Sequence, residues 1–221
     1  MYSIYLNSEG QGLGLNEFKD KMLQICTDHQ NTGEALAFAF LIYDFTNPNL
    51  WKILNDREYW MALSEISGNY LTIFSLNYRD NQKTKKPISS SKRMELITMI
   101  DTSISLKDAT RILKEKYFDC SDFSFPSILF FQVEDNQVTG SLAIELKEEK
   151  IEEGFIEIKR YIEEAVSTLK KVSNDDYIDS HKIFELLSKN LEKLKTRNKI
   201  IGITRNFGNI VNLISNITSI F

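Results

Sequence analysis

Residues 123–133 read Phe-Ser-Phe-Pro-Ser-Ile-Leu-Phe-Phe-Gln-Val, so a proline stands before an apolar run, and a polar turn follows at 134–137. The run is too short for an ordinary helix but has the length of a buried β-strand. Pro126 has no backbone N–H, which suits the first position of such a strand. We therefore expect a strand at 126–133 and its antiparallel hairpin partner at 138–146, across the short turn.

Around this hairpin, apolar patterns typical of strands and helices alternate along the chain. Strands are predicted at 2–6, 34–45 and 70–78, and helices at 50–68, 105–117, 153–172 and from Leu15 onward. Asn47 or Asn49 is expected to cap the helix that begins near Leu50, and Gly68 to end it. Alternating strands and helices followed by a hairpin and a helix predict an α/β fold with a mixed central sheet flanked by helices.

This element order, with a proline opening the first hairpin strand, resembles the thioredoxin fold over roughly residues 1–172. The segment 125–131, Phe-Pro-Ser-Ile-Leu-Phe-Phe, is similar to the Ile-Pro-Thr-Leu-x-x-Phe segment of that family. The family's proline is cis and faces the active-site loop, so the resemblance implies a cis bond between Phe125 and Pro126.

The family's redox motif would fall just after the long strand, at the start of the second helix. Residues 45–51 occupy that place, read Phe-Thr-Asn-Pro-Asn-Leu-Trp, and contain no cysteine. Dithiol exchange needs a thiolate at a helix N-terminus, and neither Cys26 nor Cys120 matches the motif. The resemblance therefore implies the scaffold without the disulfide chemistry. A candidate binding groove remains near the same place, formed by Asn47, Asn49, Trp51, Phe125 and Pro126.

Residues 173–221 are predicted to form a helical arm beyond the 1–172 domain. Its first helix, at 178–196, carries apolar residues at three–four–three spacing, namely Phe184, Leu187, Leu191 and Leu194. After Asn198 a second helical series repeats this spacing over three heptads, as in the a and d positions of a coiled coil. This candidate assembly seam comprises Ile200, Ile203, Phe207, Ile210, Ile214, Ile217 and Phe221.

So narrow an apolar stripe requires a partner surface. Gly202 and Gly208 weaken the segment as a free helix by about 1 kcal/mol each relative to alanine. Packing within the protein or its oligomer ranks first, followed by docking on another protein and then by association with a membrane. Within residues 199–221 only Lys199 and Arg205 are cationic, so the electrostatic attraction of this segment to anionic lipid is small.

Composition excludes several other classes of protein. A net charge of −4 and a pI of about 5.4 argue against nucleic-acid binding. Two cysteines provide no disulfide framework and fit a reducing compartment. The N-terminus lacks the pattern of a secretory signal, and the apolar run at 35–43 has about half the length of a membrane span. We expect a soluble cytoplasmic protein.

No metal or cofactor site is predicted. His29 and His181 are the only histidines, and neither has a cysteine or histidine at ligand spacing. Gly10, Gly12 and Gly14 stand where a phosphate loop would lie, between a strand and a helix. However, they do not match the dinucleotide fingerprint, and no Gly-Lys-Ser/Thr is present.

The sequence thus favours a non-catalytic thioredoxin-like protein that acts as an interaction or assembly module through its C-terminal amphipathic helices. Its partner would be another protein or a second copy of the chain. One alternative is a cysteine-independent small-molecule sensor or enzyme that uses the groove near Trp51 and Pro126. A weaker alternative is a membrane-associating effector.

Overall fold

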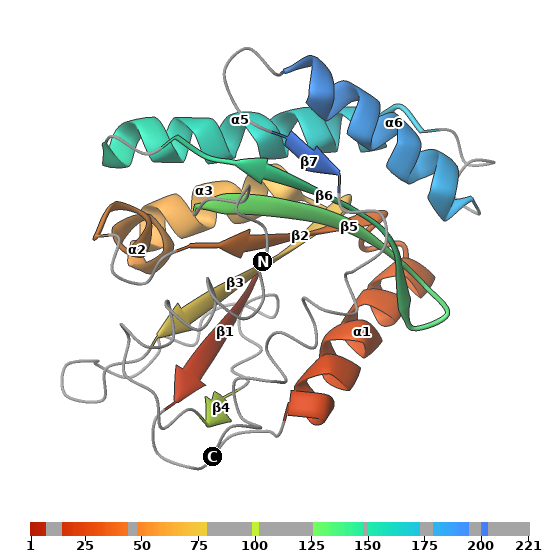
Figure 1. The fold of residues 1–221 in the computed structure, drawn as a ribbon, viewed down its shortest axis with the longest axis horizontal. Helices are drawn as coiled ribbons and strands as arrows, with labels where there is room; N and C mark the ends of the chain where they lie inside the picture. The colour runs from red at the N-terminus through yellow and green to blue at the C-terminus, as the bar shows by residue number, and fades with distance from the viewer. Residues whose placement is uncertain are drawn as a thin grey trace.

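The protein is an α/β structure in which a mixed sheet is flanked by helices (Figure 1). The computed structural model describes residues 1–7, 15–43, 48–78, 99–101, 126–147, 150–172, 179–194 and 200–202. The helix predicted at 105–117 and the seam beyond Gly202 lie outside these residues.

The strands of the described ranges are β1 (Tyr2–Asn7), β2 (Ala37–Ile42), β3 (Leu71–Tyr78), β4 (Met99–Asp101), β5 (Ser127–Glu134), β6 (Gln137–Glu145) and β7 (Ile200–Gly202). The helices are α1 (Leu15–Asn31), α2 (Pro48–Asn55), α3 (Arg57–Ser67), α5 (Ile151–Lys170) and α6 (Ser180–Lys193). The strands form one sheet in the order β4-β1-β3-β2-β5-β6-β7. β1 pairs in parallel with β3 and β4, and β2 with β3, whereas β5, β6 and β7 each run antiparallel to the strand before them in that order.

The hairpin predicted from the Pro126 segment is confirmed. β5 is buried along its length up to Glu134, and it pairs with β2 on one side and β6 on the other. Asp135 and Asn136 form the turn with φ of 50° and 58°, the left-handed values that a two-residue type I′ turn requires. Gln132 pairs with Gly140 and Val133 with Val138, so Thr139 is the extra residue of a β-bulge.

An aromatic row crosses one face of the sheet. Phe74 on β3 stacks with Tyr2 on β1 at 5.7 Å between ring centroids and with Phe40 on β2 at 6.2 Å. Phe131 on β5 continues the row, 6.4 Å from Phe74 and 5.5 Å from Phe38. Helix α1 covers this face.

Helices α2, α3, α5 and α6 pack against one another away from α1 (Figure 1). α5 buries Ile158, Ile162, Ala165 and Leu169, which recur at helical spacing on one of its faces. α6 packs along α5 and reaches β5 and β6, where the ring of Phe184 lies against Gly140. Alanines on β2, which point away from the aromatic face, leave room for the helices on this side.

The single helix predicted at 50–68 is wrong, because the chain forms two helices there. α2 already begins at Pro48, and Asn49 lies inside it, so Asn49 is not the cap. The carboxylate of Asp56 interrupts the run by accepting hydrogen bonds from the backbone N–H groups of Glu58 and Tyr59, at 2.8 and 3.4 Å. Asp56 is thus the N-cap of α3. Gly68 ends α3 as expected, with φ of 52°.

The helix predicted after Asn198 is wrong at its start. Ile200–Gly202 form strand β7, in which Ile200 pairs with Ile144 and Gly202 with Leu142. The edge of β6 offers unpaired backbone groups, and β-branched isoleucines suit a strand there. The helix predicted at 178–196 is confirmed as α6, whose Leu187 and Leu191 are fully buried. The division of the chain between 172 and 173 stays a prediction.

Candidate functional site

Only some residues of the groove predicted at the start of the second helix lie in the part of the chain that the structure describes. Asn47, Phe125 and the side chain of Trp51 lie outside what the structure describes. Asn49 is half-buried in α2, and Pro126 is buried, with its carbonyl accepting a 2.8 Å hydrogen bond from the N–H of Leu146. The groove, like the cis bond before Pro126, therefore stays a prediction.

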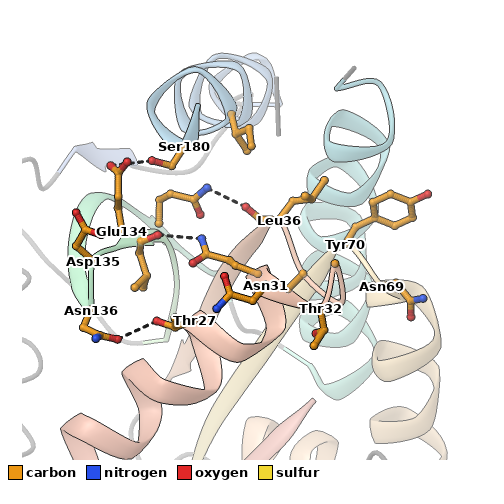
Figure 2. A pocket seen from close by; sticks show the side chains of 16 residues that line it. Thr27, Asn31, Thr32, Leu36, Asn69, Tyr70, Glu134, Asp135, Asn136 and Ser180 are labelled. Carbon is orange, nitrogen blue, oxygen red and sulfur yellow. Dashed lines mark hydrogen bonds between the residues drawn. The ribbon is translucent and has the colours of Figure 1, made fainter. Parts of the chain in front are cut away.

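A cleft of about 890 Å³ lies at the opposite end of β5 from Pro126. It is enclosed by the C-terminus of α1, the starts of β2 and β3, the β5–β6 turn and the first turn of α6. In Figure 2 the turn residues Glu134 and Asp135 face Asn69 and Tyr70 across the opening, with Asn31 of α1 between them. The sequence did not reveal this cleft, because its walls come from five separate segments.

Two side-chain hydrogen bonds join α1 to the β5–β6 hairpin beside the cleft. Gln30 Nε2 donates to the carbonyl of Val133 at 2.9 Å, and Thr27 Oγ1 donates to Oδ1 of Asn136 at 2.9 Å. These bonds fix the end of the helix against the turn (Figure 2). The wall of the cleft is consequently built before any ligand arrives.

Gln132 is the buried polar residue of the cleft. Its side chain is 1% exposed, and its Nε2 donates a 2.8 Å hydrogen bond to the carbonyl of Leu36. Its Oε1 is buried without a hydrogen-bond partner among the described residues. A buried acceptor without a donor is costly, which singles this oxygen out among the lining atoms.

Charge in the cleft comes from the hairpin turn. Glu134 Oε2 accepts a hydrogen bond from Ser180 Oγ at 3.0 Å and lies 3.7 Å from His181 Nε2. The carboxylate of Asp135 forms no ion pair with any described residue, and it is exposed. No lysine or arginine is among the described residues that line the cleft.

His29 has a structural position rather than one in the cleft. Its Nε2 lies 2.7 Å from the hydroxyl of Tyr2, and its Nδ1 lies 2.7 Å from Oγ1 of Thr72. Both ring nitrogens are therefore engaged in joining α1 to β1 and β3. Across the described ranges, no group of three or more His, Cys, Asp or Glu side chains is placed to hold a metal ion.

Cys26 is a buried free thiol in α1. Desolvation by burial raises the pKa of this thiol well above its ordinary value, which outweighs a smaller lowering by a backbone hydrogen bond. The thiolate needed for nucleophilic or redox chemistry is thus disfavoured at Cys26. Cys120 lies outside the described residues.

Of the helices that the structure describes, none combines the length and the apolar character needed to cross a membrane. No protein-family model, no curated protein and no solved structure matches the chain.

Proposed function

We propose that this chain is a redox-inactive, thioredoxin-like protein that acts by binding a protein partner, in the first instance a second copy of itself. The observation that carries the proposal is the strand arrangement. β1, β3 and β2 run parallel in the middle of the sheet, and the antiparallel β5–β6 hairpin follows directly after Pro126. Helices on both sides of this sheet agree with the resemblance that the sequence suggested.

The chemistry of the cysteines supports a binding role. The place of the family's redox motif is the start of α2, where the sequence is Asn-Pro-Asn and holds no cysteine. Cys26 is buried in α1 with a raised pKa. A thioredoxin-like scaffold with these features lacks the means for dithiol exchange. A buried free thiol also fits a reducing compartment, and we propose the cytoplasm.

The C-terminal seam is the proposed assembly element, with its helical part beginning after β7. β7 extends the described sheet at the edge of β6, so Gly202 lies in an outer strand of that sheet. From there the apolar spacing of the sequence continues through Ile203, Phe207, Ile210, Ile214 and Ile217. Such a stripe buries its apolar side chains when two copies pair.

Light scattering on the full-length chain tests the proposal. We expect a dimer or larger assembly that becomes monomeric in the variant Ile210→Glu/Ile214→Glu, because two charges would be buried in the seam. The matched control, Asn212→Glu/Asn216→Glu, adds the same charge to the same segment off the seam and should keep the assembly.

Circular dichroism confirms that both variants fold. A monomeric wild-type chain, or the same mass for the seam variant as for the wild type, would contradict the proposal.

A further inference from the structure

We propose that the cleft between the end of α1 and the β5–β6 turn binds a small organic diamine through its ammonium groups. This site is distinct from the C-terminal seam, and the inference does not depend on assembly. Four features of the cleft favour a cation that donates hydrogen bonds.

The first feature is the carboxylates. Glu134 and Asp135 stand next to each other at the rim, and no cationic side chain is among the described lining residues. Two described side chains contact the Glu134 carboxylate, and both contact its Oε2. Ser180 Oγ donates a 3.0 Å hydrogen bond to this oxygen, and His181 Nε2 lies 3.7 Å from it. An ammonium group that approaches Asp135 would therefore meet negative charge at the rim without displacing a lysine or an arginine.

The second feature is the C-terminus of α1. Gln30, Asn31 and the following Thr32 and Gly33 line the cleft, so the C-terminal end of a 17-residue helix borders it. The negative end of the helix dipole favours cations within the last turn. The first turn of α6 also reaches the cleft, with the positive end of its dipole. Its N-cap Asp179 accepts the N–H of Lys182 and lies 3.8 Å from Lys182 Nζ, so this end of the cleft adds no net negative charge.

The third feature is the buried amide of Gln132, which is independent of the surface charge. Its Nε2 is held by the carbonyl of Leu36 at 2.8 Å, which fixes the orientation of the amide. Its Oε1 is left without a donor, although the residue lines the cleft. An N–H group of a ligand would supply the missing donor, whereas an acceptor-only group such as a carboxylate could not.

The fourth feature is the spacing of the acceptors. Gln132 and Glu134 are two residues apart on one strand, so their side chains leave the same face of β5, separated by roughly 7 Å along the chain. A linear diamine with a four-carbon chain presents donors at two ends. One end would lie near Gln132 and the other between Glu134 and Asp135.

The probes are 1,4-diaminobutane and its uncharged analogue 1,4-butanediol, titrated into the full-length protein by isothermal calorimetry. The two molecules have the same length and differ in charge and donor groups. We expect measurable heat of binding for the diamine, none for the diol, and weaker diamine binding as salt is raised.

Two variants locate the site. Glu134→Gln/Asp135→Asn removes both rim charges with little change of shape and should weaken diamine binding about tenfold or more. The control Glu152→Gln/Glu153→Gln removes two adjacent charges from the first turn of α5, outside the cleft, and should leave the affinity within about twofold of wild type. Gln132→Met removes the buried acceptor and should also weaken binding.

Absence of diamine binding to the folded wild-type protein would overturn the proposal. It would be overturned equally by diol binding of similar strength, or by equal losses in the rim variant and the α5 control.

Discussion

A Cβ atom placed on Gly140 would lie 2.7 Å from Cδ1 of Phe184, so the aromatic ring of α6 occupies the space above this glycine of β6. The helix that the sequence assigned to a C-terminal arm is thus seated on the sheet of its own chain. Ile183, Leu187 and Leu191 of the same helix are buried beside it. The described first part of the predicted arm therefore packs in cis, on the sheet of its own chain.

Gly140→Ala should destabilise the protein, because the new methyl group would overlap Cδ1, Cε1 and Cγ of the Phe184 ring. These atoms belong to a rigid ring and not to the end of a flexible side chain. Overpacking of this kind costs about 1–3 kcal/mol. Urea unfolding followed by circular dichroism measures the change in the free energy of unfolding.

The control is the same substitution in a Phe184→Ala background, where the space above residue 140 is open. The cost of Gly140→Ala should largely disappear there. A cost that is equal in both backgrounds would show that the contact with Phe184 is not its cause.

Strands and the hairpin were predictable because their signals are local. The apolar run of β2 and the position of Pro126 before β5 each follow from a few adjacent residues, and all six residues of β2 are buried. The type I′ turn was marked by Asp135 and Asn136, two residues that tolerate positive φ.

Features that depend on contacts between distant segments were not predictable. Ile200 fits both the heptad spacing and a strand, and only the edge of β6 decides for the strand. Asp56 lies within an apolar pattern that continues across the break, so periodicity joined α2 and α3 into one helix. The cleft depends on the meeting of α1, the hairpin turn and α6, which no single stretch of sequence reveals.

Asp56→Ala should destabilise α3, since the Asp56 carboxylate accepts the N–H groups of Glu58 and Tyr59. Loss of an N-cap side chain costs about 1 kcal/mol, within a range of about 0.5–2 kcal/mol. Thermal and urea unfolding measure the effect. Asp56→Asn keeps a capping oxygen and should retain most of the stability, so equal losses in the two variants would argue against the cap.

Tyr2→Phe should lower the free energy of unfolding by about 1 kcal/mol, because it removes the hydroxyl that lies 2.7 Å from Nε2 of His29. The matched control is Tyr59→Phe. The ring of Tyr59 packs 4.6 Å from that of Phe155, and no hydrogen bond of its hydroxyl is found among the described residues. If the two substitutions have the same effect in urea unfolding, the contact between Tyr2 and His29 does not stabilise the fold.

The stability of the protein should depend on pH through Cys26. Burial raises the pKa of this thiol in the folded state, whereas the unfolded chain has the ordinary value of about 8.5. The unfolded state therefore loses its proton first. The contribution of the Cys26 thiol to the free energy of unfolding is complete below about pH 8.5. It decreases as the pH rises toward the pKa of the folded state, by up to about 1.4 kcal/mol per pH unit.

The measurement compares Cys120→Ser with Cys26→Ala/Cys120→Ser by urea unfolding between about pH 7 and 10, a window that spans the ordinary thiol pKa. Both proteins lack Cys120, so the difference between their profiles reports on Cys26 alone. We expect the protein with Cys26 to lose stability more steeply above about pH 8.5. Parallel profiles across the whole window would mean that the Cys26 thiol titrates alike in the folded and unfolded states, contrary to its burial in α1.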